Sequence, residues 1–145
     1  FRGLGISKIS YGDLFVQSIR DWRERFHGRI GFECLYPIWN TPTVQFAQNF
    51  IESGRKAILT CGDTKLLDSS FAGREYDQSL LEDLPEGVDP CGENGEFHTF
   101  VYDGPEFFEP VCFDRGKVEI REFDDPGHRF RFGFCDLRPV ASHIS

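Results

Sequence analysis

The sequence predicts an α/β fold in which a parallel sheet is followed by a smaller mixed α+β lobe with antiparallel strands. Short apolar stretches alternate with helical patterns up to residue 61, which is typical of parallel strands joined by helices. After residue 97, apolar and polar residues alternate between turn residues, which indicates antiparallel strands. Because a polar stretch separates the two patterns, we expect one unit at 1–65 and a second at 66–145.

The first strand and helix are expected at 6–10 and after Asp13. Asp13 is a favourable N-cap, and Gly28 is a favourable helix terminator. Apolar residues recur between them at helical spacing, namely Phe15, Ile19, Trp22 and Phe26.

A second strand at 32–36 is expected to precede a helix that begins at Thr41-Pro42 and stops at Gly54. The apolar face of that helix consists of Val44, Ala47 and Ile51, flanked by Phe46 and Phe50. A third strand at 56–61 follows. Strand, helix and strand of these lengths predict a right-handed parallel βαβ unit.

The second part is expected to hold a short helix at 78–84, capped by Asp77, and then antiparallel strands. One strand covers 97–102. Two more contain Val118 with Ile120 and the alternating phenylalanines at 130, 132 and 134, with a turn at 124–127 between them.

Composition excludes several classes of partner. The 145 residues carry a formal charge of −8 without a Lys/Arg-rich run, so a nucleic acid is not expected as the main partner. No apolar run is long enough for a membrane span, and no signal peptide is recognisable. The five cysteines have no CxxC spacing, which argues against zinc and disulfides and favours the reducing cytosol.

The chain contains no Met and begins at Phe1. We interpret this as an internal or C-terminal piece of a longer protein. The sequence leaves open whether that protein forms a homodimer.

The run from Asp89 to Pro105 is the richest in chemistry-bearing residues. Its turn-forming glycines lead into the strand at 97–102, and loops of this kind often carry functional groups. Asn94-Gly95 also suits a plain hairpin turn, but Pro90 and the glycines beside it disfavour the preceding strand that a hairpin needs. The polar groups of the run are Cys91, Glu93, Asn94, Glu96, His98, Thr99 and Asp103.

Small or polar residues also follow each of the three expected parallel strands. They are Gly12 with Asp13, residues 37–40, and Gly62 with Asp63. Ligands of open parallel sheets bind beyond the carboxyl ends of the strands, so these positions are compatible with a nucleotide crevice. The alternative is that Asp13 only caps a helix and Gly12 only makes a turn.

These residues together resemble the family of diphthine–ammonia ligases and related PP-loop ATP pyrophosphatases. The most specific block is LPEGVDPCGENGEFHTF at 84–100. The shorter matching blocks are YGDLF at 11–15, Arg20 with Arg23-Glu24, LYPIW at 35–39, TCGD at 60–63 and FAGR at 71–74. EFHTF, where eukaryotic ligases have EYETF, resembles the bacterial branch.

The resemblance implies a Rossmann-like PP-loop domain that binds ATP and a C-terminal lobe with the substrate pocket. Members of the family adenylate a carboxylate, which is carried by a protein in eukaryotes and archaea, and ammonia then displaces AMP. The phosphate-gripping SGGKDS loop is absent from this chain, so we expect little ATP-dependent activity from these residues alone. The alternative is a binding module without turnover.

The family chemistry suggests roles for the conspicuous side chains. Glu93 and Glu96 are candidates to hold Mg²⁺, orient ammonia or accept its proton. His98, Thr99 and Asn94 are candidates to hydrogen-bond the acyl group, while Gly92 and Gly95 allow backbone amides to approach it. Catalytic candidates are therefore Glu93, Glu96, His98 and Thr99, with Asn94, Gly92 and Gly95 on the substrate side.

The remaining candidates each have a structural alternative. Trp39, after Pro37, is expected either to stack on adenine or to pack in the core. Arg20 contacts substrate or pairs with Glu24 on a helix. Arg74 likewise contacts substrate or an acidic neighbour. Cys91 is a nucleophile or, on the simpler interpretation, an inert thiol in the substrate pocket.

Overall fold

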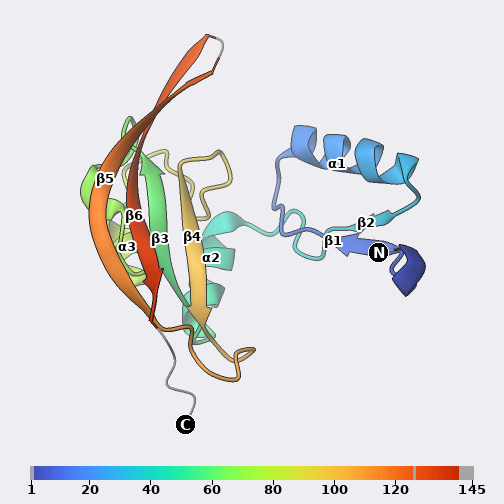
Figure 1. Cartoon of the computed structure of the whole chain (residues 1–145), viewed down its shortest axis with the longest axis horizontal. Coiled ribbons are helices and arrows are strands. Elements are labelled where there is room, and N and C mark those ends of the chain that lie inside the picture. Colours follow the sequence, from blue (N-terminus) through green and yellow to red (C-terminus); the bar gives the residue numbers. More distant parts are fainter. Residues whose placement is uncertain (1, 126, 141–145) are drawn as a thin grey trace.

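The computed structural model describes residues 2–125 and 127–140, which form two sheets of different character (Figure 1). β1 and β2 are parallel, and the other sheet has the antiparallel order β4-β3-β6-β5. The α/β class and the antiparallel second part are thus as the sequence predicts. The elements are η1 (Arg2–Leu4), β1 (Lys8–Ser10), α1 (Gln17–Arg29), β2 (Glu33–Leu35), α2 (Thr43–Glu52), β3 (Lys56–Asp63), η2 (Ser69–Phe71), α3 (Gln78–Asp83), β4 (Phe97–Asp103), β5 (Phe113–Asp125) and β6 (His128–Pro139).

The first unit is the expected strand, helix and parallel strand. Ile9 of β1 lies opposite Cys34 of β2, and α1 connects the two strands. The helix begins at Gln17 with Val16 at its N-cap, so the expected cap at Asp13 is wrong. The Asp13 carboxylate instead accepts a hydrogen bond from Arg23 Nη2 at 3.0 Å, because the turn before α1 places it beside the helix rather than above its first turn.

The third expected strand does not join β1 and β2. β3 pairs antiparallel with β4 on one edge and with β6 on the other. Its central residues Ala57, Ile58 and Leu59 are at most 1 % exposed. A buried central strand is apolar in either kind of sheet, so its sequence does not reveal its direction. The change of sheet therefore lies between β2 and β3, upstream of the expected division at residue 65, which remains a prediction about folding units.

The main core lies between the antiparallel sheet and the helices α2 and α3. Ala47 of α2 and Leu80 of α3 pack with Leu59 and Phe97 of the sheet and with Tyr76. At α3 the expected cap is confirmed, because the Asp77 carboxylate accepts a hydrogen bond from the Leu80 amide at 2.9 Å. The sheet and the helices packed on it therefore form a rigid support for the loop that precedes β4.

β5 and β6 form a long hairpin that extends beyond the rest of the sheet (Figure 1). Asp125 and His128 are its last paired residues, so Asp124 and Asp125 of the expected turn at 124–127 belong to β5, and the chain reverses after them; Pro126 lies outside the described residues. Among the described residues, no helix is both long enough and apolar enough to cross a membrane.

Candidate functional site

The loop before β4 is organised around the carboxylate of Glu96, which is only 3 % exposed. Its Oε1 accepts hydrogen bonds from the Asp89 amide and from Asn94 Nδ2, both at 3.0 Å, and its Oε2 accepts one from the Asn94 amide at 2.9 Å. Burial by itself would raise the pKa of Glu96, but the hydrogen bonds from Asn94 and Asp89 outweigh it and lower that pKa. Glu96 therefore stays ionised and folds the loop around itself.

Two glycines allow this loop to turn tightly. Gly92 has a φ of 68°, and a Cβ at this position would lie 2.8 Å from the backbone oxygen of Phe97. Gly95 has a φ of 87°, a conformation that side chains other than Gly rarely adopt. Residues 84–96 contain no strand, so the plain hairpin interpretation of Asn94-Gly95 is wrong.

A cavity of about 480 Å³ lies between this loop, α2, the sheet and the segment before α1. Its wall is mostly apolar, which is typical of ligand sites with a few placed polar groups. Glu93, Cys91, Thr99 and Tyr76 supply the polar groups. The other lining residues are Gly12, Leu14, Ile38, Phe46, Phe50, Ala57 and Val101.

Glu93 connects the two units at the edge of this cavity. Its Oε2 accepts a hydrogen bond from the backbone amide of Leu14 at 3.0 Å, across 79 positions of sequence. Leu14 is 2 % exposed, and its carbonyl accepts a 2.7 Å hydrogen bond from the Asn40 amide. The TCGD segment, by contrast, lies within β3, so Gly62 and Asp63 do not follow a parallel strand.

Thr99 and His98 are neighbours in β4 and therefore point to opposite faces of the sheet. Thr99, opposite Leu59, lines the cavity. His98 lies opposite Cys61 and is not among the cavity-lining residues. The structure thus separates two side chains for which the sequence suggested a common role.

Cys91 is in the cavity wall but lacks the surroundings of a reactive cysteine. Its thiol donates a hydrogen bond to the Thr43 carbonyl, with Sγ and O 3.3 Å apart. Burial, followed by the charges of Asp89 and Glu93, raises the pKa of Cys91 to about 12. The thiol is therefore neutral near pH 7, which fits a packing or contact role.

The candidate nucleotide contacts are divided between the cavity and the outer face of the first unit. Gly12 lines the cavity, whereas Asp13 is paired with Arg23 and Pro37 is exposed in the turn after β2. Trp39 stacks with a cation, because the Arg20 guanidinium carbon lies 4.7 Å from its ring centroid.

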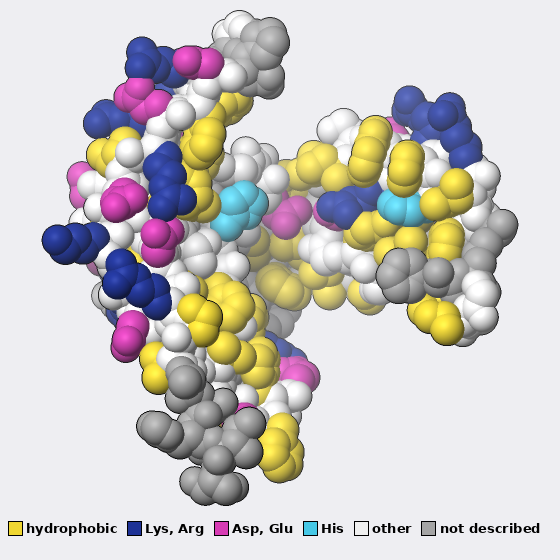
Figure 2. All heavy atoms as spheres, viewed as in Figure 1, with side chains coloured by type: hydrophobic (Ala, Val, Ile, Leu, Met, Phe, Trp, Pro, Cys, Tyr) yellow, Lys and Arg dark blue, Asp and Glu magenta, His cyan; other side chains and the backbone are white. Residues whose placement is uncertain are grey.

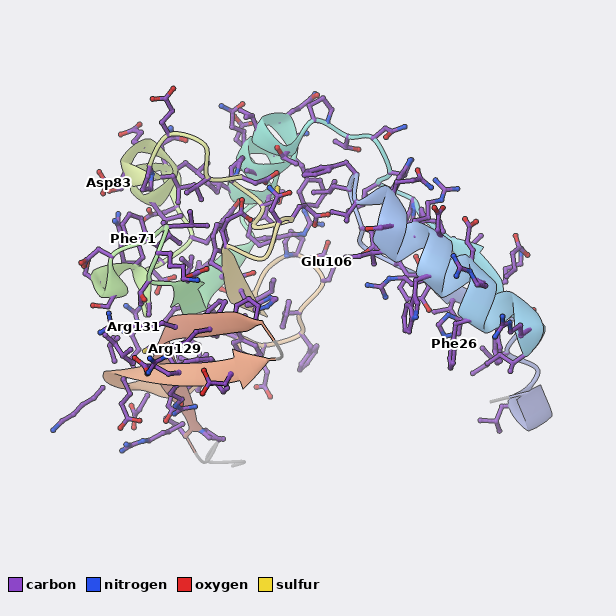
Figure 3. The ribbon with its side chains drawn as sticks, turned by 90° about the horizontal axis from the view of Figure 1, so that it is seen from above. Phe26, Phe71, Asp83, Glu106, Arg129 and Arg131 are labelled. Carbon is purple, nitrogen blue, oxygen red and sulfur yellow. The ribbon has the colours of Figure 1, made fainter. Side chains whose placement is uncertain are left out.

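Both candidate arginines for substrate have partners elsewhere. Arg20 Nε lies 2.9 Å from Glu24 Oε1, which is the helical pairing that the sequence left open. Arg74 Nη2 lies 2.7 Å from Asp83 Oδ2 and its guanidinium carbon is 4.9 Å from the Phe71 ring centroid. Figure 3 shows Phe71 and Asp83 on the α3 side of the molecule, far from the tip of α1 at Phe26.

The sequence did not single out the aromatic wall of the cavity. The helical pattern predicts Phe46 and Phe50 only as part of an apolar helix face, and no sequence motif indicates that Tyr76 or Val101 lines a cavity. The Tyr76 hydroxyl donates a 2.5 Å hydrogen bond to the Pro90 carbonyl, which fixes the loop to the core. Among the described residues, no group of three or more His, Cys, Asp or Glu side chains is arranged to hold a metal ion.

An α/β unit is thus joined to an antiparallel lobe, and a carboxylate loop and a cavity lie where the two meet. Residues 42–139 match the family described as the diphthamide synthase C-terminal domain, and the chain belongs to this family. The matched range contains the whole antiparallel sheet and the loop built around Glu96.

Named relatives agree with the family assignment. The chain is 28 % identical over 127 residues to the diphthine–ammonia ligase of Danio rerio, covering 82 % of this chain and 49 % of that protein. The Bos taurus and Homo sapiens diphthine–ammonia ligases are 29 % and 27 % identical over 124 residues, again covering 82 % of this chain and 46 % of each relative. The chain thus spans about half the length of these curated relatives.

Proposed function

We propose that this chain forms the acceptor-substrate side of an ATP-dependent ligase site of the diphthine–ammonia ligase kind. The observation that carries the proposal is the cavity at which Glu93 and Thr99, from the loop and strand of the family block, meet Gly12 and Leu14 of the first unit. The named relatives are ligases, so a carboxylate, ammonia and ATP are the expected reactants.

The reaction would proceed through an acyl-adenylate that ammonia converts to an amide, with release of AMP and pyrophosphate. Such an intermediate must be protected from water, and an apolar wall with few polar groups suits this requirement. Thr99 would hydrogen-bond the acyl group. Glu93 would orient ammonia or accept its proton, since its carboxylate borders the cavity.

Glu96 supports this site indirectly, because its two oxygens are occupied by groups of its own loop. Mg²⁺ usually keeps several waters and binds one or two carboxylates together with substrate phosphates. Glu93 is the cavity-lining carboxylate that fits this pattern, and the ion would supply neutralising charge to the phosphates there.

The cationic and backbone groups that grip the nucleotide triphosphate would lie outside the described residues. No Lys or Arg is among the cavity-lining residues of the described chain. The first unit also exposes large apolar side chains, including Trp22 at 57 % and Phe26 at 51 %. Figure 2 shows hydrophobic side chains gathered on the surface of this unit. This surface would pack against an upstream PP-loop segment of the kind that the resemblance implies.

The test uses the full-length protein in an ATP–pyrophosphate exchange assay with a panel of carboxylates. Thr99→Val is expected to lower exchange, and Glu93→Gln to lower ammonia-dependent amide formation measured in parallel, each by about 100-fold or more, as for loss of a positioned hydrogen-bonding or acid–base group. His98→Ala, on the other face of β4, is the matched control and is expected to retain activity. Equal activity of all variants would remove this cavity from the reaction.

The second candidate is a binding module without turnover. It is favoured by the lack of a cationic side chain in the described cavity wall. If the full-length protein binds ATP, measured by calorimetry, but shows no exchange with any carboxylate, this candidate replaces the first.

A further inference from the structure

The outer strand of the antiparallel sheet has an open edge. β5 covers Phe113–Asp125 and is the last strand in the order β4-β3-β6-β5, so among the described residues it pairs only with β6. Val118, Ile120 and Phe123 in this strand are 42 %, 45 % and 48 % exposed. A long edge strand with exposed apolar residues is a template for pairing with another strand.

The hydrogen bonds of β6 identify which backbone groups of β5 face outward. The Arg131 carbonyl accepts a 2.8 Å hydrogen bond from the Thr64 amide and so points away from β5. Since backbone groups alternate along a strand, those of Phe132 and Phe134 point towards β5, where Arg121 and Glu119 lie opposite them. The amides and carbonyls of Val118, Ile120 and Glu122 therefore point to the open edge.

We propose that two copies of this chain associate by antiparallel pairing of β5 with itself, centred on Ile120. In this register Val118 and Glu122 lie opposite each other, and all of the outward-facing backbone groups meet outward-facing groups. The two copies of Ile120 lie opposite one another, with Val118 of each chain diagonally beside them. These apolar side chains, exposed in the single chain, are then covered.

Charge selects this register over its neighbours. Centring on Ile120 places Glu119 opposite Arg121 of the partner subunit, and this favourable pair occurs twice. Among the nearby shifts that keep the same backbone alternation, those centred on Glu119, Arg121 or Glu122 place two like charges opposite each other at the twofold axis. A bulge between Arg115 and Val118 limits pairing beyond Val118.

Arg121 has the donors needed for both its intrachain and intersubunit partners. Its Nη2 lies 3.0 Å from Asp136 Oδ1 and 3.6 Å from Glu119 Oε2 in the same chain. A guanidinium has five N–H donors, so the Asp136 contact can persist while Glu119 of the partner subunit is bound. The partner is thus a second copy of this chain, which matches the edge in both hydrogen bonding and charge.

The first test is the mass of the full-length protein by light scattering over a dilution series. We expect a species of twice the mass of one full-length chain, and Glu119→Arg should weaken association by about tenfold through two like-charge pairs. Glu109→Arg changes the net charge equally but lies in the loop before β5, so it should associate as the unchanged chain does. A monomer at every concentration, or equal behaviour of both variants, would contradict the proposal.

The second test fixes the register by disulfide cross-linking in a Cys112→Ser background, which removes an exposed native thiol. Ile120→Cys places two thiols opposite each other, within the Cα separation that a disulfide spans, and should yield a covalent dimer. Glu122→Cys faces Val118 of the partner subunit and should remain monomeric on a non-reducing gel. Cross-linking through residue 122 but not 120 would refute the register.

Discussion

Glu96 shows how one buried carboxylate can organise a polar loop. It accepts three hydrogen bonds from Asp89 and Asn94, which hold the loop against β4. Its neighbour in the motif, Glu93, faces the cavity and bonds the distant Leu14 amide. Two glutamates that looked equivalent in the sequence therefore have different surroundings, one structural and one at the edge of the cavity.

Glu96→Gln is expected to destabilise the fold by about 1–3 kcal/mol, because a side-chain amide cannot accept all three buried donors. The lowered pKa of Glu96 means that its stabilisation is present above the unfolded-state pKa and is lost as pH falls through the folded-state pKa. Denaturant unfolding between pH 7 and pH 3 should therefore show a smaller loss of stability on acidification for the variant than for the unchanged chain.

Glu86→Gln is the matched control for this measurement. Glu86 is exposed in the same loop, so its replacement should change the free energy of unfolding by less than about 0.5 kcal/mol. If Glu96→Gln behaved like this control, the hydrogen-bond network would not be what stabilises the loop.

Individual elements differ in how far their sequences determine them. The α3 cap at Asp77 and the β5–β6 hairpin follow from local signals, because the interacting groups are close in sequence. The start of α1 and the pairing of β3 do not follow from local signals. Asp13 forms an ion pair with Arg23 instead of capping the helix, and β3 pairs with β4 and β6, which lie far along the chain.

Gly92, in the loop leading to β4, is the position at which both the backbone conformation and the surrounding atoms require glycine. Gly92→Ala is expected to cost about 1–2 kcal/mol for the left-handed φ, and more because its Cβ would meet the Phe97 backbone at 2.8 Å. Denaturant midpoints measure this loss.

Gly95→Ala separates the cost of the left-handed backbone conformation from the cost of the steric contact. Gly95 also has a positive φ, but a Cβ there meets nothing within 4 Å. The Gly95 variant should therefore lose only the conformational part, and an equal loss at both positions would show that the contact with Phe97 is unimportant.

At the scale of the whole molecule, the junction between the two units can be tested at a single hydrogen bond. The 3.0 Å hydrogen bond from the Leu14 amide to Glu93 is one that joins the first unit to the loop before β4. Glu93→Ala should raise the exchange rate of the Leu14 amide hydrogen by about tenfold, as expected for loss of one hydrogen bond of about 1.4 kcal/mol.

The Leu59 amide, which bonds the Arg74 carbonyl in the core at 2.9 Å, is the internal reference for that measurement. Its exchange by NMR should change far less than that of Leu14. Glu93→Gln retains an oxygen acceptor and should restore part of the protection. Unchanged Leu14 exchange in Glu93→Ala would mean that other contacts hold the units together.

The sequence by itself determined the α/β class, the α3 cap at Asp77, the β5–β6 hairpin and the 84–100 block that identifies the family, whereas Gly28, expected to end α1, lies inside that helix. Only the tertiary structure decided that β3 belongs to the antiparallel sheet, that Thr99 faces the cavity while His98 does not, and that Glu93 reaches Leu14. The physical reason is the separation along the sequence of the residues that interact. Caps and turns arise between neighbouring residues, whereas strand pairing, strand face and contacts between units depend on residues that only the folded chain brings together.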